Sequence, residues 1–328
     1  MTEFSPLGVD LFGQPIARAD HGKAPPLAER FTFPPFSVLD ARGGEWQDRK
    51  RAWIATGIES EIGRSGVRSD EHVESASLKG LTHGISCDAY ARAGEEGSAA
   101  AASGVSIFDP VLCEMAYRWF SPSAGSVIDP FAGGSVRGIV AGMLGRAYDG
   151  VDLSAEQCAA NQEQKRRLCG EASVRWHNGD SAERLPSLAK PGGYDFALSC
   201  PPYFNLEVYS DHPKDLSAMP WADFVSGYRD IISKTAGLLK SDAFAMFVVG
   251  DIRDERGLYR DLPGETTRAF LDAGMSLYNE AVLVTAVGSL SLRAGRSFAA
   301  TRKLGKAHQN VLVYVKGDPR KAADAVSA

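Results

Sequence analysis

The sequence predicts an α/β fold, with a mostly parallel seven-stranded sheet, helices on both faces and an antiparallel last strand. From Val105 onward, short apolar runs alternate with longer segments of helical periodicity, which is typical of repeated strand–helix–strand units. The apolar runs are nearly continuous, as expected of parallel strands buried on both faces. The connection between the last two strands is too short to hold a crossover helix comfortably, so this pair is expected to be antiparallel.

The expected elements follow one another in a regular order. A helix over 110–120 opens the series, because Val111, Met115 and Trp119 share one face at four-residue steps. Strands are expected at residues 126–128, 147–151, 174–177, 194–198, 243–249, 276–284 and 310–315. Helices are expected at 135–144, 155–168, 181–185, 221–239 and 265–273.

Residues 1–104 lack this alternation and are expected to form an N-terminal extension that contacts DNA or a partner. Its one predicted helix, 45–57, carries Trp46 and Trp53, which we expect to pin the helix to the main domain rather than stack on bases. The small-residue-rich segment 92–104 is expected to be a linker. The main domain then covers 105–318, and 319–328 form a tail.

Composition limits the class of protein. Of 328 residues, 44% are hydrophobic and 23% charged, as in ordinary soluble globular proteins. No apolar run approaches the roughly 20 residues of a membrane span. The five cysteines form no CxxC pair, which argues against a disulfide framework or a structural zinc site and favours a reducing cytoplasm. A net charge of −5 excludes a wholly basic nucleic-acid coat but allows a local basic patch.

The first candidate binding loop runs from Asp129 to Ser135 and reads DPFAGGS. Its glycines let the backbone approach a ligand closely, and the helix that begins there offers free N–H groups to a carboxylate. The loop does not fit the dinucleotide fingerprint G-x-G-x-x-G and lacks a phosphate-loop lysine. Asp152 and Asp180 follow the next two strands. Each acid alone suits a helix N-cap, but three at successive strand ends indicate a nucleoside site.

The second candidate loop follows strand 194–198 and reads SCPPY from Ser199 to Tyr203. Two consecutive prolines restrict the backbone, so the loop presents Tyr203 rigidly. Both loops end parallel strands, and ligands bind at the carboxyl ends of such strands. The pair therefore predicts a cofactor and a planar substrate at one edge of the sheet.

Together the two loops resemble motifs I and IV of the amino-group DNA methyltransferases, over residues 105–316 and in the motif order of the gamma group. The catalytic part is also similar to methylases common in bacteriophage genomes, which implies the cytoplasm of a bacterium or of a bacterial host. This resemblance implies a class I methyltransferase sheet, S-adenosylmethionine as cofactor and double-stranded DNA with a flipped base as partner. Ile107 to Pro110 resemble motif X, near the methionine end of the cofactor. The implied cofactor residues are Phe108, Asp129, Pro130, Phe131, Gly133, Ser135, Asp152 (ribose hydroxyls) and Asp180 (adenine amine).

The resemblance also implies a catalytic set. Methylating an exocyclic amine requires hydrogen-bond acceptors that localise its lone pair, and the family takes them from the residue before Pro-Pro and from the first proline's carbonyl. Transferred here, the catalytic residues are Cys200, Pro201, Pro202 and Tyr203, with Tyr203 stacking on the flipped base.

Cys200 departs from the family's Asp, Asn or Ser, and a thiol is a weak acceptor. The target therefore stays open between adenine N6 and cytosine N4. A nucleophilic Cys200, as in C5-methyltransferases, is disfavoured because those enzymes place their cysteine after a proline, not before Pro-Pro. The chemistry needs no metal, and no ligand cluster in the sequence indicates one.

Three further segments lie near the predicted site. Glu207 and Tyr209 are candidates for lining the substrate pocket, against an equal expectation of a solvated loop. Residues 250–254 favour a capped turn over a functional role. Residues 288–309 form a basic insert without acids, expected to contact phosphates, whereas Arg49 to Arg51 are a weaker candidate. The basic residues of the insert are Arg293, Arg296, Arg302, Lys303 and Lys306.

The leading hypothesis is a DNA methyltransferase that modifies adenine N6 or cytosine N4. One alternative keeps the chemistry but takes RNA, since Pro-Pro-Tyr loops also serve RNA amino-methylation. The other is a degenerate module that binds cofactor or DNA without catalysis, because Cys200 replaces the usual acceptor.

Overall fold

The computed structural model describes residues 31–59, 107–206, 208–287 and 290–327. The chain divides into two compact units, Met1–Pro35 and Phe36–Ala328, and the second contains the sheet. Residues 36–59 of the expected N-terminal extension thus share a unit with the main domain. The expected linker at 92–104 lies outside the described residues.

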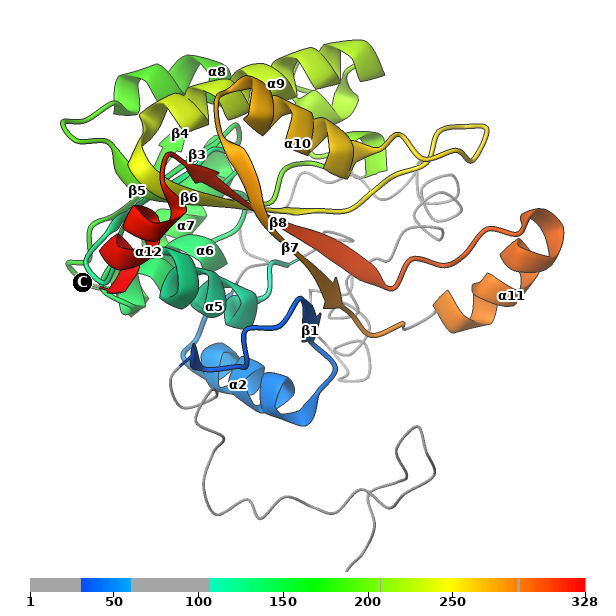
Figure 1. The fold of residues 1–328 in the computed structure, drawn as a ribbon, viewed down its shortest axis with the longest axis horizontal. Helices are drawn as coiled ribbons and strands as arrows, with labels where there is room; N and C mark the ends of the chain where they lie inside the picture. Colours follow the sequence, from blue (N-terminus) through cyan, green and yellow to red (C-terminus); the bar gives the residue numbers. More distant parts are fainter. Residues whose placement is uncertain (1–30, 60–106, 207, 288–289, 328) are drawn as a thin grey trace, which may run out of the picture. The chain divides into compact units, whose positions relative to one another are not determined.

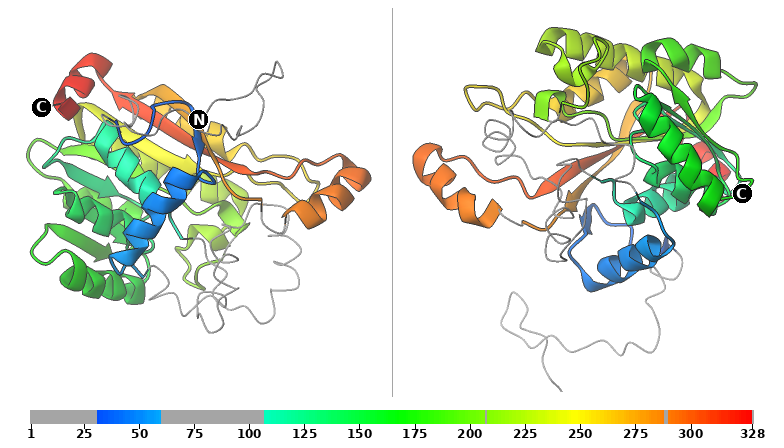
Figure 2. Two further views of the ribbon diagram at one scale, coloured as in Figure 1. Left: turned by 90° about the horizontal axis from the view of Figure 1, so that it is seen from below. Right: turned by 180° about the vertical axis from the view of Figure 1, so that it is seen from behind.

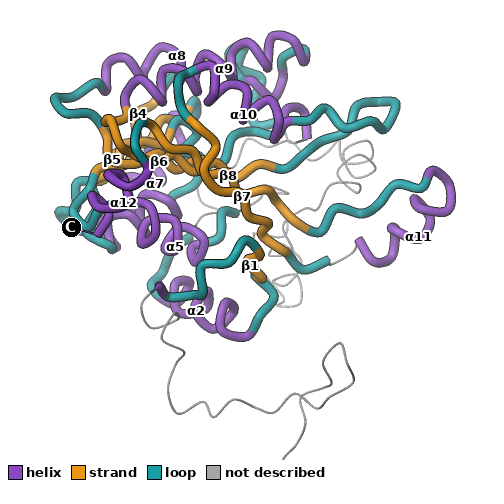
Figure 3. The backbone as a smooth tube through the Cα atoms, viewed as in Figure 1, coloured by secondary structure: helices purple, strands orange, loops and turns teal. Residues whose placement is uncertain are grey.

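The second unit is built on one eight-stranded sheet with the order β1-β7-β8-β6-β5-β2-β3-β4 (Figures 1 and 3). Strand β8 pairs antiparallel with both β6 and β7, and every other pairing is parallel. The strands are β1 (Val38–Asp40), β2 (Ser126–Asp129), β3 (Ala147–Asp152), β4 (Val174–Asn178), β5 (Tyr194–Ser199), β6 (Leu239–Val249), β7 (Ser276–Val284) and β8 (His308–Lys316).

This arrangement confirms the predicted fold class, a mostly parallel sheet whose last strand is reversed. The seven expected strands are all present, and an eighth, β1, adds to the outer edge of β7. Because β1 has only three residues, it carries no periodicity that a sequence pattern could reveal.

Helices cover both faces of the sheet (Figure 1). Helices α8, α9 and α10 pack together on one face, and α5 contacts α2, α6 and α12 on the other, where α7 also contacts α6. The helices are α2 (Gly44–Ala55), α5 (Pro110–Phe120), α6 (Val136–Met143), α7 (Ala155–Leu168), α8 (Ser181–Arg184), α9 (Trp221–Leu238), α10 (Leu262–Asp272), α11 (Leu290–Thr301) and α12 (Pro319–Ser327).

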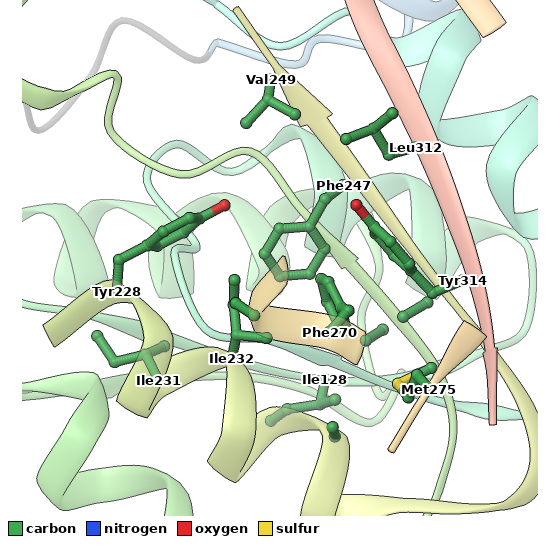
Figure 4. Close-up of a cluster of buried hydrophobic side chains, with 14 of the residues drawn as sticks. Ile128, Tyr228, Ile231, Ile232, Phe247, Val249, Phe270, Met275, Leu312 and Tyr314 are labelled. Atoms are coloured by element: carbon green, nitrogen blue, oxygen red, sulfur yellow. The ribbon is translucent and has the colours of Figure 1, made fainter. Parts of the chain in front are cut away.

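The main core lies between the sheet and helices α9 and α10 (Figure 4). Phe270 stacks on Tyr314 with ring centroids 4.1 Å apart and meets Phe247 edge-on at 4.9 Å. The tyrosine hydroxyls here find partners: Tyr228 lies 2.9 Å from the hydroxyl of Thr266. Such aromatic pairs add about 1 kcal/mol each beyond their area burial, so this core fixes the strands that carry the two loops.

Helix α2 is fixed to α5 by its two tryptophans. The indole N–H of Trp46 donates to Asp109 (3.1 Å), and that of Trp53 donates to Glu114 (2.8 Å). Arg49 also binds Glu114 with two hydrogen bonds. The expectation that the tryptophans pin this helix to the main domain is confirmed, and Arg49 is used in the same attachment.

Two segments are more ordered than expected. The basic insert contains helix α11, which stands apart from the sheet in both views of Figure 2. The expected tail contains helix α12, which packs on α5 and β6 and buries Ala322. Helix α11 is no crossover, because the strands it joins are antiparallel.

Candidate active site

Asp129 connects the two loops. It ends β2 and is completely buried. Its carboxylate accepts hydrogen bonds from the Nε of Arg137 (2.6 Å), the hydroxyl of Tyr148 (2.8 Å), the backbone N–H of Phe131 (3.1 Å) and the hydroxyl of Ser199 (2.5 Å). The last bond joins the 129–135 loop to the strand that leads into the 200–203 loop. Asp129 therefore stabilises the site from the protein interior and offers no accessible surface to a ligand.

Arg137 is the partner that makes this burial tolerable. Its guanidinium is buried and also donates to the carbonyls of Phe131 and Ala132. Burial would lower the pKa of Arg137, but the Asp129 carboxylate outweighs it and raises the pKa. Arg137 could not be predicted as part of the site, because an arginine in the first turn of a helix gives no sign that it turns back under the preceding loop.

The carboxylate of Asp152 binds the backbone of Gly133 in the first loop. Gly133 has φ = +50°, and its N–H donates to the carboxylate of Asp152 at 2.9 Å. The other Asp152 oxygen accepts from the N–H of Ser154 at 2.8 Å. Asp152 is half-buried at the end of β3, so its side chain is partly accessible there. From the far side, Asn161 donates to the carbonyl of Gly133 at 2.7 Å.

Asp180 stands at the start of α8 and is an N-cap. One carboxylate oxygen accepts from the N–H of Ala182 at 2.7 Å. The other lies 4.0 Å from the Nζ of Lys214, which also pairs with Glu183. Asp180 is half-buried, so capping does not consume its whole acceptor capacity.

The remaining predicted cofactor residues divide into two kinds. Pro130 and Ser135 are buried: the Pro130 carbonyl accepts from Ser181, and the Ser135 hydroxyl donates to Gln164 at 3.1 Å. Like Asp129, they shape the loop and show no open surface. By contrast, the rings of Phe108 and Phe131 are partly exposed, Phe108 beneath the guanidinium of Arg137 at 4.7 Å.

Tyr203 is held by contacts from three directions. Its hydroxyl accepts from the side-chain amide of Gln309 (3.0 Å) and lies 3.3 Å from the Sγ of Cys200. It is also 3.4 Å from the carbonyl of Val248, to which it donates. The ring lies against Gly250, where an added Cβ would approach a ring carbon to 3.0 Å. Gln309 could not be predicted, because its side chain meets Tyr203 only through the pairing of β8 in the sheet, whereas Gly250 begins the segment 250–254 that was expected near the site.

The backbone after Tyr203 turns sharply. Phe204 has φ = +51°, a left-handed conformation that is strained for a bulky side chain. Packing holds it there: its ring is 5.2 Å from that of Trp221 and 5.4 Å from that of Phe224, and the residue is 6% exposed. Pro201 is buried and Pro202 partly exposed. The loop is therefore rigid on both sides of Tyr203.

The next loop is organised by one buried acid. Asp215 accepts hydrogen bonds from the N–H and hydroxyl groups of both Ser210 and Ser217, at 2.6 to 2.9 Å. Tyr209, a candidate for the pocket lining, is 40% exposed on this loop. Glu207, the other candidate, lies outside the described residues.

The basic residues of the insert belong to helix α11 and to the segment that follows it. Arg293 and Arg296 belong to α11, and Arg302, just after it, has its guanidinium 5.3 Å from the ring of Phe298. Lys303 and Lys306 follow, and Lys306 donates to Asn310 at 3.0 Å. Lys306 lies three residues before Gln309, whose side chain contacts Tyr203 in the catalytic loop.

Within the described ranges, no helix is long and apolar enough to cross a membrane. The same ranges contain no group of three or more histidine, cysteine or acidic side chains that could hold a metal ion.

Comparison with known proteins gives similarity to solved structures alone. No protein-family model and no curated protein matches the sequence. TrmN from Thermus thermophilus is 17% identical with a TM-score of 0.44, over 64% of this chain and 49% of TrmN, so this chain spans about half of TrmN. The magnesium protoporphyrin IX methyltransferase ChlM from Synechocystis PCC 6803 with bound SAM is 12% identical (TM-score 0.43; 74% and 96% covered).

A third similar structure is the precorrin-6y C5,15-methyltransferase from Geobacter metallireducens, with 11% identity and a TM-score of 0.41, over 63% of this chain and 87% of that one. Shared folds host many activities, so the function has to be judged from this chain's own residues.

Proposed function

We propose that this protein is an S-adenosylmethionine-dependent methyltransferase that modifies the exocyclic amine of a flipped DNA base, at adenine N6 or cytosine N4. The observation that carries the proposal is the hydrogen bond from Ser199 to Asp129. It ties a glycine loop flanked by two half-buried acids to a Pro-Pro-Tyr loop, so a nucleoside cofactor and a planar base would share one edge of the sheet.

The residues present fit the cofactor. Asp152 and Asp180 are half-buried carboxylates that follow the neighbouring strands β3 and β4, where they would accept hydrogen bonds from the ribose hydroxyls and the adenine amine. Phe131 offers a partly exposed apolar surface between them and the second loop. When bound, S-adenosylmethionine supplies an electrophilic methyl group.

The protein's own contribution is to place and polarise the substrate. Tyr203 is braced by Gln309 and Gly250, so it can stack on a flipped base without reorganising. The Pro201 carbonyl would accept a hydrogen bond from the exocyclic amine, which directs the nitrogen lone pair toward the methyl group. Ser199 is not placed to accept from the amine, because it is completely buried and its hydroxyl is turned toward Asp129.

The thiol of Cys200 is expected to lower the activity of the site, because it replaces a stronger hydrogen-bond acceptor. This thiol lies 3.3 Å from the Tyr203 hydroxyl and helps to hold the ring of Tyr203 in place. Members of the resembled family have a strong hydrogen-bond acceptor at this position. A thiol is a weak acceptor, and the Pro201 carbonyl would then carry most of the amine contact. This contact is the one observation that favours the degenerate, non-catalytic alternative.

The test is methyl transfer from labelled S-adenosylmethionine to unmethylated DNA and, separately, to RNA. Transfer to DNA is expected, and Tyr203→Ala should lower it by at least about tenfold, the loss of one stacking contact. Tyr278→Ala is the matched control, because Tyr278 is 46% exposed at the opposite end of the sheet. Nucleoside analysis of the product would identify the methylated base.

The outcomes separate the alternatives. Labelling of RNA but not DNA would replace the proposal by RNA amino-methylation. Binding of the cofactor with no transfer to either polymer would identify a degenerate module. Labelling at carbon 5 of cytosine would show that Cys200 is a nucleophile after all.

A further inference from the structure

A short turn leaves the end of β6 beside the catalytic tyrosine. Residues 251–261 fold back on themselves, with Arg253 and Tyr259 paired as an antiparallel bridge and Gly257 at φ = +83°. The turn begins directly after Gly250, on which the ring of Tyr203 lies. The expectation of a capped turn here is confirmed, since the Asp251 carboxylate accepts from the N–H groups of Ile252 and Leu262.

Positive side chains from two segments meet on this turn. The guanidinium of Arg253 lies 3.7 Å from the ring centre of Tyr259, and the Nζ of Lys306 lies 6.0 Å from the same ring. The Nζ of Lys303 fills the space beside Gly257. The guanidinium of Arg260 lies 5.1 Å from the ring centre of Phe204 and 4.9 Å from that of Trp221. Phe204 directly follows Tyr203, so this positive charge lies next to the catalytic loop.

Three of the four acids in residues 251–261 accept hydrogen bonds from backbone N–H groups, Asp261 from Gly264, whereas Glu255 is exposed. Asp251 caps the turn, and Asp254 accepts from the N–H of Leu258 at 2.8 Å. Among the described residues, no carboxylate forms an ion pair with Arg260, Lys303 or Lys306. Burial lowers the pKa of Lys306, which Asp251 partly restores and Arg253 lowers again. Cations gathered at the cost of mutual repulsion indicate a binding site for an anion.

Apolar side chains are exposed among these cations. Tyr259 is 47% exposed, Leu258 54% and Leu304 72%. An aromatic ring flanked by arginine and lysine is the combination that holds a polynucleotide strand, since the cations bind phosphates and the ring stacks on a base. An acidic protein surface would engage the cations but would leave the exposed tyrosine without a partner of matching chemistry.

We propose that residues 251–261 and 302–306 form one DNA-binding surface, the turn surface, which holds the strand next to the flipped base. Arg260, Lys303 and Lys306 contact its phosphates, and Tyr259 stacks on a neighbouring base. The proposal rests on the proposed function, because that function places the flipped base on Tyr203. It adds Arg253, Tyr259 and Arg260, which lie outside the basic insert.

The test is the affinity of the full-length protein for a fluorescently labelled DNA duplex, measured by anisotropy over a range of salt concentrations. Tyr259→Ala should weaken binding by about tenfold, the loss of one stacking contact, whereas Tyr259→Phe should bind like the wild type. Arg260→Gln should reduce the slope of log K against log salt by about 1. Lys321→Gln is the matched control, a loss of one exposed charge on α12.

Equal affinities and salt slopes for Tyr259→Ala, Arg260→Gln and Lys321→Gln would overturn the turn surface. So would a preference for RNA of the same sequence over the DNA. The measurement needs no methyl transfer, so the two proposals fail separately. Turn-dependent DNA binding without methylation would remove the enzymatic proposal and keep the surface, and methylation with unchanged affinities would do the reverse.

Discussion

Replacing Asp129 by alanine should destabilise the protein strongly, because it removes the shared acceptor of four hydrogen bonds. The change leaves the Arg137 guanidinium, whose side chain is 6% exposed, without its carboxylate partner. It also leaves the hydroxyls of Tyr148 and Ser199 without an acceptor. Breaking a buried ion pair by removing one partner costs about 3–5 kcal/mol, and each orphaned buried donor adds about 1 kcal/mol or more, though not additively.

A loss of about 4 kcal/mol corresponds to a fall in Tm of roughly 10 °C for a domain of this size. The assay is thermal unfolding followed by circular dichroism, together with the urea midpoint. Asp129→Asn keeps an acceptor oxygen and should lose less. The double variant Asp129→Leu with Arg137→Met removes both charges and should be more stable than Asp129→Ala, because no buried charge is left unpaired.

These variants distinguish a structural Asp129 from a ligand-binding one. Asp129→Ala within about 1 kcal/mol of the wild type, combined with complete loss of cofactor binding, would refute the reasoning. That result would mean that Asp129 acts on the cofactor directly rather than through the loop it builds.

Two further predictions concern the side-chain contacts of Gln309 and Glu114, which could not be predicted from the sequence. Gln309→Leu removes the donor to the Tyr203 hydroxyl and should lower kcat several-fold without changing the affinity for the cofactor. Combining it with Tyr203→Phe should lower kcat no further, and additive losses in this double-mutant cycle would contradict the contact. Burial alone would raise the pKa of Glu114, but its hydrogen bonds to Arg49, Trp53 and Arg118 outweigh burial and lower the pKa. The ionised carboxylate therefore stabilises the fold above about pH 4.5, and this stabilisation is lost as the pH falls through the folded pKa. Glu114→Gln should therefore be less stable than the wild type by about 1 kcal/mol or more at pH 7 and by less at pH 3.5, measured as urea midpoints; an equal difference at both values would contradict the ionic role.

Most elements of the sheet could be predicted because each is long enough to show a period. Helices 110–120 and 155–168 and strand 276–284 coincide with the expected ranges. Strand β1 could not be predicted, since three residues show no pattern and their pairing with β7 depends on a distant part of the chain. Helix α11 was hidden by Gly295 and by a composition typical of a basic loop.

The site shows the same division. The strand ends that carry Asp152 and Asp180 follow from the order of elements, and the structure places both acids half-buried at neighbouring strand ends. The direction of a side chain does not follow from that order. Asp129 turns inward to Arg137, and nothing in the local sequence separates it from an acid that turns outward.

The pairing of β1 with β7 also bears on how the chain folds. Val38 pairs with Val282, so this edge of the sheet joins two segments that lie far apart in the sequence. Helix α2 contacts Asp109 and Glu114, which are much nearer to β1 in the sequence, and this contact would hold β1 close to the sheet. We expect the pairing of β1 with β7 to form late in folding, because closing so long a loop of chain is slow.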